Sequence, residues 1–180
     1  MIDLERLFGK LAITASLVVD SEGNHIGPDG TSKSLGGPLD LELLLAFRKA
    51  AGAVLTTGKT ARMENYRMPS SAALFVLSRQ DRDSLPLAIR SESAKLIGSG
   101  TSSGLESAFK DIEQQGYSKI HVEFGPTTLV EMAKSQQKVR IFVSSDSESG
   151  AQHFADKHNL RTLHAIKVDY LYVTEVSGRA

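Results

Sequence analysis

The sequence predicts an α/β fold in which helices cover both faces of a mostly parallel central sheet, with an antiparallel edge at its C-terminal end. Apolar β-rich segments alternate with helical segments along the chain, and this alternation is typical of parallel sheets. The last apolar stretch, Leu160 to Val176, has the length of two closing strands. Of the 180 residues, 41% are hydrophobic, so residues 1–180 are expected to form one domain around one core.

The first third of the chain predicts a buried strand, a long loop and a helix. Leu11 to Val19 is β-rich with few charges, as a central strand buried on both faces should be. Ser21 to Gly37 contains five glycines and one proline, which predicts a loop, and loops of that length are usually functional. Pro38 begins a helix that Gly52 ends. Its apolar stripe is expected to consist of Leu41, Leu44, Leu45 and Phe47.

The rest of the chain continues the alternation. The expected strands are Ala53 to Thr57, Ala73 to Ser78, Lys95 to Ile97, Lys119 to Phe124 and Val139 to Val143. The expected helices are Gly104 to Gln115, Gly125 to Met132 and Gly150 to His158. Ligands of such sheets bind just beyond the carboxyl ends of the strands. The residues that follow each strand are therefore the candidates for a site.

The composition excludes several classes of function. Lys and Arg (21) balance Asp and Glu (21) with no run of like charge, so a nucleic-acid partner is not expected. The absence of cysteine excludes disulfides, thiolate nucleophiles and Cys-containing zinc sites. His153 and His158 are either metal ligands or solvated helix residues, and we expect no metal. The segment MIDLERLFGK has features of neither a signal peptide nor a membrane span, so a cytoplasmic protein is expected.

Three strand ends carry residues suited to binding phosphate. Each combines a glycine or a hydroxyl group with a cation or with the free N–H groups of a helix start. They are Gly58-Lys59-Thr60 after the second strand, Ser78-Arg79 after the third, and Gly125-Pro126-Thr127 after the strand that ends in Glu123-Phe124. Each pattern alone is also consistent with an ordinary turn or a solvated loop. Three of them at equivalent ends of adjacent strands favour a nucleotide site.

The commonest glycine-rich nucleotide motifs are absent from the sequence. The chain contains no GxGxxG, and Gly58-Lys59-Thr60 lacks the upstream glycine of a P-loop. A P-loop nucleoside triphosphatase is therefore disfavoured.

Three segments resemble segments of known reductases. Ala53-Val-Leu-Thr-Thr-Gly-Lys-Thr-Ala-Arg-Met-Glu-Asn-Tyr66 resembles the DAVLxGxxTxRxExY segment of riboflavin-pathway reductase domains, and Val122-Glu-Phe-Gly-Pro-Thr-Thr-Leu129 is similar to their EGGPTL segment. Val76-Leu-Ser-Arg79 resembles the strand end at which dihydrofolate reductases hold the 2′-phosphate of NADP. With Leu11 to Ser16 and the closing strand Tyr170 to Val176, the resemblance to the reductase half of the deaminase/reductase covers nearly the whole chain.

The resemblance implies a three-layer fold of the dihydrofolate-reductase type, a homodimer, NADPH as hydride donor, and reduction of the ribosylamino group of an aminopyrimidine 5′-phosphate to ribitylamino. Carried over by position, the residues on the cofactor side would be Gly58, Lys59, Thr60, Ser78, Arg79, Gly125, Pro126 and Thr127. Those on the substrate side would be Ser16, Thr31, Ser32 and Arg67. Lys, Arg and Ser side chains suit an anionic substrate.

Some residues depart from the family pattern. Phe124 replaces the first glycine of EGG, and Lys59 stands where the family commonly has a small residue. Asn24 to Gly30 is similar to the mobile loop of dihydrofolate reductase, but Thr31-Ser32-Lys33 replaces the Leu-Pro-Trp that follows there, which argues against a folate substrate. No cysteine is present to build the zinc site of the deaminase half, so deamination is expected on another chain.

Three hypotheses about function follow. The first is an NADPH-dependent pyrimidine reductase in which the protein mainly positions the reactants. Glu123 is then either the general acid or a structural carboxylate. The second exchanges the substrate for dihydrofolate, another pterin or a carbonyl compound. The third is a non-catalytic paralogue that binds NADPH and turns over no pyrimidine.

Overall fold

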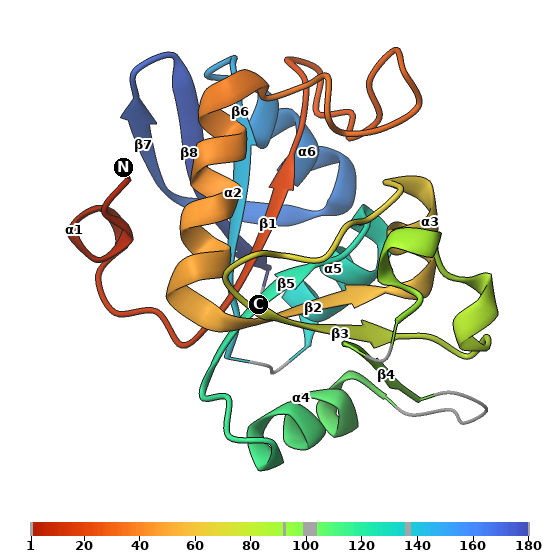
Figure 1. The fold of residues 1–180 in the computed structure, drawn as a ribbon. Helices are drawn as coiled ribbons and strands as arrows, with labels where there is room; N and C mark the ends of the chain where they lie inside the picture. The colour runs from red at the N-terminus through yellow and green to blue at the C-terminus, as the bar shows by residue number, and fades with distance from the viewer. Residues whose placement is uncertain (1, 92, 99–103, 136–137, 180) are drawn as a thin grey trace.

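The strands pair into a single mostly parallel sheet (Figure 1). The computed structural model describes residues 2–91, 93–98, 104–135 and 138–179, which form eight strands in the order β4-β3-β2-β5-β1-β6-β8-β7. The strands are β1 (Ile13–Val18), β2 (Gly52–Thr57), β3 (Ala73–Leu77), β4 (Ala94–Ile97), β5 (Lys119–Glu123), β6 (Arg140–Ser145), β7 (Leu160–Val168) and β8 (Leu171–Gly178). Neighbours from β4 to β6 are parallel, and β8 is antiparallel to β6 and β7. The expected sheet with its antiparallel C-terminal edge is confirmed.

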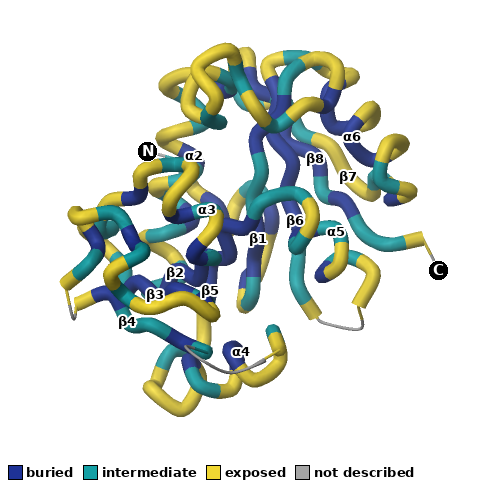
Figure 2. Tube along the Cα trace, turned by 90° about the vertical axis from the view of Figure 1, so that its right-hand side faces the viewer, coloured by how far each residue is buried: buried dark blue, intermediate teal, exposed yellow. Residues whose placement is uncertain are grey.

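Helices cover both faces of this sheet. One face carries α1 (Leu4–Phe8), α2 (Gly37–Ala51) and α3 (Gly58–Met63), and the other carries α4 (Leu105–Gln114), α5 (Pro126–Lys134) and α6 (Gly150–His158). Two 3-10 turns, Arg82–Ser84 and Leu87–Ile89, lie between β3 and β4. In Figure 2 the buried strands run between helices whose outer surfaces are exposed. The expected three-layer architecture is therefore confirmed.

The two-residue period of β5 decides which of its side chains reach the candidate site. Ile120 and Val122 point into the apolar core beneath α4, α5 and α6. Because successive side chains of a strand alternate between faces, His121 and Glu123 point to the opposite face. There they meet side chains of α2.

Most of the expected elements occur, with ends within two residues of the predicted ones. The structure adds α1, which the sequence patterns do not indicate because a five-residue helix is too short to show a helical period. Asp3 caps this helix by accepting a hydrogen bond from the backbone N–H of Arg6 at 3.1 Å.

The apolar stripe expected for α2 is wrong in part. Leu43 and Phe47 are the buried residues of this helix, whereas Leu41 and Leu45 are 54% and 45% exposed. Both pairs have helical spacing, so only the direction in which the helix packs decides between them. Leu41 and Leu44 line the cavity described below, as does Leu43.

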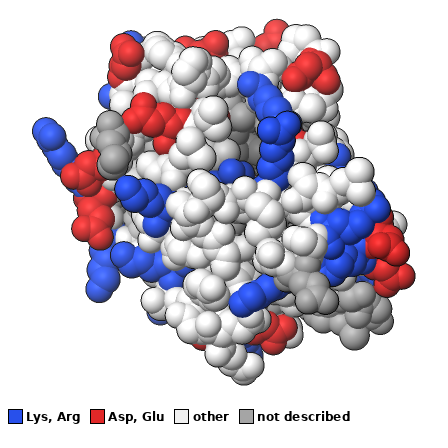
Figure 3. Space-filling view, viewed as in Figure 1, with Lys and Arg blue, Asp and Glu red and all other residues white. Residues whose placement is uncertain are grey.

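The surface carries charges of both signs. Figure 3 shows Lys and Arg interspersed with Asp and Glu on the face that carries α2. In the ranges that the structure describes, no helix is both long and apolar enough to cross a membrane, and no three His, Asp or Glu side chains cluster as metal ligands would. His153, one of the two histidines considered above as metal ligands, has its Nδ1 atom 2.7 Å from the carbonyl oxygen of Ser21.

Candidate active site

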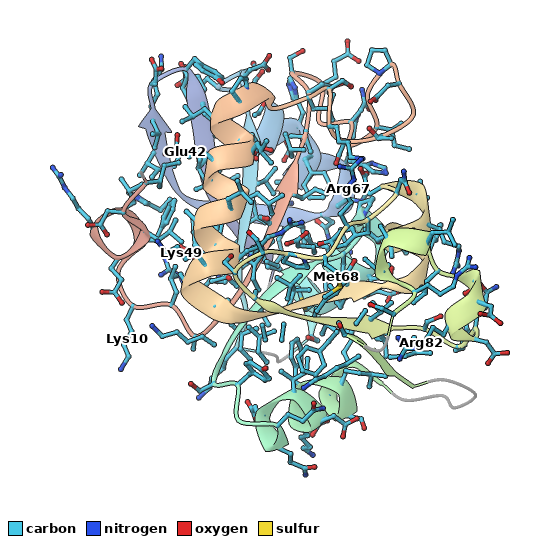
Figure 4. All side chains as sticks on the ribbon, in the orientation of Figure 1. Lys10, Glu42, Lys49, Arg67, Met68 and Arg82 are labelled. Carbon is cyan, nitrogen blue, oxygen red and sulfur yellow. The ribbon has the colours of Figure 1, made fainter. Side chains whose placement is uncertain are left out.

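A large cavity lies at the carboxyl ends of the central strands. Its volume is about 1250 Å³, above the range of roughly 300–1,000 Å³ that is typical of a site for one small ligand. The adjacent strands β2, β5, β1 and β6 reach it through Thr57, Glu123, Ser16 and Ser144. In Figure 4 the labelled Arg67 and Met68, which also line the cavity, lie on the segment that follows α3 and crosses the sheet. The cavity is therefore larger than a single small ligand needs.

The structure brings most of the sequence-predicted site residues to this cavity. β3, β2 and β5 are neighbours in the sheet, so the three candidate phosphate-binding strand ends lie side by side, as predicted. The predicted residues that line the cavity are Ser16, Ser32, Lys59, Thr60, Arg67, Glu123, Gly125, Pro126 and Thr127. Those that do not line it are Thr31, Gly58, Ser78 and Arg79.

The four residues outside the cavity lining have other surroundings. Thr31 turns back on its own loop, where its hydroxyl donates to Asp29 Oδ2 at 2.7 Å. Gly58 packs on Ser78, because a Cβ atom at Gly58 would lie only 2.7 Å from Ser78 Oγ. The Ser78 hydroxyl bonds within its own turn, and Arg79 is exposed beside it. These last two residues lie at the end of β3, one strand beyond the cavity.

The N-terminus of α5 faces the cavity. Gly125 is its N-cap and offers no side chain to the first N–H groups of the helix, and Thr127 and Thr128 line the cavity. Unpaired N–H groups and the helix dipole make such an end favourable for an anion. Gly125 has an ordinary φ of −66°, and its own N–H donates to Thr60 Oγ1 at 3.1 Å. Its backbone conformation therefore does not require glycine.

A buried charge cluster joins α2 to the end of β5. Arg48 Nε and Nη2 donate to the two carboxylate oxygens of Glu123, each at 2.7 Å. The Tyr66 hydroxyl donates to Glu123 Oε2, and Arg48 Nη2 also donates to that hydroxyl at 3.0 Å. The side chains of Arg48 and Glu123 are only 15% and 10% exposed. Bidentate, charge-assisted bonds of this kind are among the strong hydrogen bonds of proteins.

The cluster holds Glu123 in its ionised form. Burial by itself raises the pKa of the Glu123 carboxyl, but the hydrogen bonds and the charge of Arg48 outweigh burial and lower that pKa. Burial and the Glu123 charge raise the pKa of the Tyr66 hydroxyl well above its ordinary value. Because an ionised carboxylate has no proton to donate, these contacts favour the structural interpretation of Glu123 over the general acid.

A second carboxyl group on the cavity wall has the opposite character. Asp40, in the first turn of α2, lines the cavity and accepts a hydrogen bond from Ser144 Oγ. Burial raises the pKa of Asp40, and the bond from Ser144 offsets only part of that rise. Gly36 leaves room for this side chain, because a Cβ atom at Gly36 would lie 2.2 Å from Asp40 Cβ. Asp40 therefore keeps its proton to a higher pH than an ordinary aspartate does.

The sequence patterns do not single out Asp40, Arg48 and Tyr66 as site residues. One signal could have indicated the first two. Asp40, Leu44 and Arg48 follow one another at intervals of four residues, which places them on one face of α2, and all three line the cavity. Charged residues at both ends of an apolar helix face suggest a face that meets a ligand rather than a core.

Comparisons with known proteins give structural matches. No family model matches the sequence, and no curated protein does. A pyrimidine reductase-like protein from Corynebacterium diphtheriae matches with a TM-score of 0.64 and 18% identity, over 98% of this chain and 94% of that one. Acinetobacter baumannii RibD matches with a TM-score of 0.69 and 14% identity, over 98% of this chain and 60% of that one. Schistosoma mansoni dihydrofolate reductase matches with a TM-score of 0.56 and 14% identity, over 92% of this chain and 96% of that one.

These similarities define the class of fold. The chain has the dihydrofolate-reductase-like fold, which it shares with riboflavin-pathway reductase domains, so the resemblance seen in the sequence is confirmed at the level of the fold. In particular, the chain spans nearly the whole of the C. diphtheriae protein but about 60% of the length of RibD.

Proposed function

We propose that this protein is an NADPH-dependent reductase that converts the ribosylamino group of an aminopyrimidine 5′-phosphate to ribitylamino. The observation that carries the proposal is the cavity of about 1250 Å³ at the strand ends. Around this cavity lie the N-terminus of α5, which no side chain caps and which suits a phosphate group, and the carboxyl group of Asp40, whose pKa is raised. The sequence resemblance supports NADPH and a pyrimidine over other pairs of ligands, and the fold shared with pyrimidine reductase-like proteins is consistent with both.

NADPH, when bound, would supply the hydride. The residues proposed to hold it follow the carboxyl ends of β2, β3 and β5. Lys59, Thr60 and the N-terminus of α5 would bind the pyrophosphate, because cations and free N–H groups stabilise phosphate there. Ser78 and Arg79, at the next strand end along the sheet, would bind the 2′-phosphate. The uncapped N-terminus of α5 on the cavity wall is the observation that fits a phosphate group.

The substrate would occupy the side of the cavity formed by Ser16, Ser32 and Arg67. Arg67 is exposed and would bind the substrate phosphate, since a guanidinium group can engage two phosphate oxygens at once. Reduction of the open-chain imine adds a hydride to the sugar carbon and a proton to the nitrogen. Asp40 is the group that we propose as the proton donor, with Ser144 orienting its carboxyl. Water would return the proton to Asp40 after each turnover.

The test of this function is oxidation of NADPH in the presence of the aminopyrimidine ribosylamine 5′-phosphate, with dihydrofolate as the control substrate. We expect loss of NADPH absorbance with the pyrimidine and not with dihydrofolate. Turnover of dihydrofolate alone would favour a pterin reductase. Saturable NADPH binding without any turnover would favour the non-catalytic paralogue. The cytoplasmic location and the homodimer stay predictions.

A further inference from the structure

His121 lies fully buried between two hydroxyl groups beneath the cavity. Its Nδ1 atom is 2.8 Å from Thr14 Oγ1, and its Nε2 atom is 3.0 Å from Ser16 Oγ. The strand register explains this arrangement, because Thr14 pairs with His121 between β1 and β5, and Ser16 points to the same face two residues later. The ring of Phe47 stacks on the imidazole with 4.9 Å between ring centroids and 3° between the planes. These contacts fix both nitrogen atoms in place.

The position of one proton on this ring decides what Ser16 offers to the cavity. The ring is neutral near pH 7, because burial lowers the pKa of His121 to about 4, and a neutral imidazole carries a proton on one nitrogen only. With the proton on Nε2, the ring donates to Ser16 Oγ, and the Thr14 hydroxyl donates to Nδ1. With the proton on Nδ1, both bonds reverse. Ser16 keeps its own hydroxyl proton for a ligand only in the first case.

The charges beside the ring favour the proton on Nε2. The carboxylate oxygen Oε1 of Glu123 lies 4.0 Å from Nε2. Glu123 is ionised, and a negative charge attracts the positive end of a nearby N–H bond. Arg48, bound to that carboxylate, opposes this attraction, but its effect on His121 is the weaker of the two.

Ser16 is half-buried and is one of the residues that line the cavity. Within the part of the chain that the structure describes, its hydroxyl makes one hydrogen bond, the bond with His121. If His121 donates that bond, the hydroxyl proton of Ser16 remains available to a ligand.

We propose that His121 is a positioning residue that keeps Ser16 as a hydrogen-bond donor to an acceptor oxygen of the ligand in the cavity. The substrate offers phosphate and ring carbonyl oxygens as such acceptors, and the nicotinamide half of NADPH offers phosphate and carboxamide oxygens. The inference rests on the proposed function only for the identity of this ligand. It adds a residue on β5 that selects the kind of group bound at Ser16.

The free protein provides the first test. In a long-range proton–nitrogen NMR spectrum of the ¹⁵N-labelled protein near pH 7, a protonated and an unprotonated ring nitrogen have well-separated shifts. The signals of His121 are those that disappear in His121→Gln. We expect Nε2 to be protonated and Nδ1 to be unprotonated. A proton on Nδ1 would overturn the inference whether or not the protein is a reductase.

Ligand binding provides the second test, with NADPH and the aminopyrimidine ribosylamine 5′-phosphate measured separately. His121→Met removes the hydrogen bond that orients the Ser16 hydroxyl and should weaken one of these ligands by about three- to tenfold, the range expected for one hydrogen bond. His121→Gln should retain most of the affinity, because its amide N–H can donate to Ser16 in place of Nε2. The ligand that responds identifies the source of the acceptor oxygen.

The variant Ser16→Ala is the matched control. If His121 acts through Ser16, His121→Met should cause no further loss of affinity in the Ser16→Ala background. An equal loss in both backgrounds, or no loss in either, would contradict the inference. Wild-type protein that binds neither probe would instead refute the proposed function, and the NMR measurement on the free protein would still decide the state of His121.

Discussion

Arg48 and Glu123 lie 75 positions apart in the chain and meet only after folding, when two hydrogen bonds of 2.7 Å join them. Each side chain supplies the opposite charge that offsets the free-energy cost of burying the other. Glu123→Gln would leave the guanidinium group buried without a counter-charge, and we expect the free energy of unfolding to fall by about 3–5 kcal/mol. Urea denaturation measures this change.

The exposed pair Lys110–Glu106 on α4 provides the control, because both of its side chains are more than half exposed. Glu106→Gln should leave the free energy of unfolding nearly unchanged, since water screens exposed ion pairs. Equal stability of Glu123→Gln and the wild type would show that the buried pair has no structural role. Glu123 would then return as a candidate acid.

Asp40 gives a prediction for the pH dependence of the reductase. Because burial raises the pKa of Asp40, its protonated fraction is largest at low pH and falls as the pH rises through that pKa. The activity that depends on this proton should therefore decrease on the alkaline side. Asp40→Asn should lower kcat by about 10²–10⁴-fold and remove this alkaline limb from the pH profile. A variant that retains the limb would exclude Asp40 as the donor.

Arg79 is predicted to discriminate NADPH from NADH. The two cofactors differ by a 2′-phosphate, which a guanidinium group can bind through two oxygens. Arg79→Ala should weaken the binding free energy of NADPH by about 1.5–3 kcal/mol and that of NADH by almost nothing. The preference of the enzyme for NADPH over NADH should therefore fall by about ten- to a hundredfold. Steady-state kinetics with both cofactors measures the effect.

Arg67→Ala is the paired control for Arg79→Ala, because Arg67 lines the cavity on the proposed substrate side. It should raise the KM for the pyrimidine substrate and leave that for NADPH unchanged. If Arg79→Ala changes the KM for NADPH and the KM for NADH equally, Arg79 does not bind the 2′-phosphate and is only a solvent-exposed residue of its loop.

At the scale of elements, the first residue of α3 packs closely against the residue that follows β3. A Cβ atom at Gly58 would lie 2.7 Å from Ser78 Oγ and 2.9 Å from Ser78 Cβ. Gly58→Ala should therefore destabilise the protein by about 1–3 kcal/mol through overpacking. Thermal or urea unfolding measures the loss.

Ser78→Gly should relieve the same contact from the other side. In that background the cost of Gly58→Ala should become much smaller, because the two Ser78 atoms that lie within 3 Å are gone and only Arg62 Nη1, at 3.3 Å, remains. Equal costs in both backgrounds would show that the contact does not limit this packing.

At the scale of the whole molecule, the predicted homodimer concerns the edges of the sheet. The β-rich alternation of the closing segment from Tyr170 to Val176 predicts an edge strand, but β8 lies between β6 and β7, so β7 is the edge strand on this side of the sheet. Leu163 on β7 is 51% exposed, beside a break in the ladder between Thr162 and His164. An uncovered edge with an exposed apolar side chain is a candidate for pairing with a second copy.

Light scattering at micromolar concentration should give the mass of a dimer, and Leu163→Glu should reduce it to that of a monomer if β7 is the contact. A monomeric wild-type protein would reject the prediction. A dimer that persists in Leu163→Glu would place the contact elsewhere.

The fold was predictable because its signals are local. The β-rich runs, the helical spacing on α4 and the glycines that end α2 and begin α3 each lie within a few residues of one another. The three candidate phosphate-binding strand ends were also predictable, since parallel strands bring their carboxyl ends to one edge of the sheet. By itself, therefore, the sequence determined the layers, the mostly parallel sheet and the edge at which the cavity opens.

Only the tertiary structure decided how residues combine at that edge. Whether α2 buries Leu43 or Leu41 depends on the direction in which the helix packs, and both choices satisfy the helical period. The contact between Ser16 and His121 spans 105 positions and requires the register of β1 against β5. The charge states of Glu123 and Asp40 likewise depend on burial and on partners distant in sequence. Local patterns carry no information about such pairs, because electrostatic interactions depend on the distance between groups in space and not on their separation along the chain.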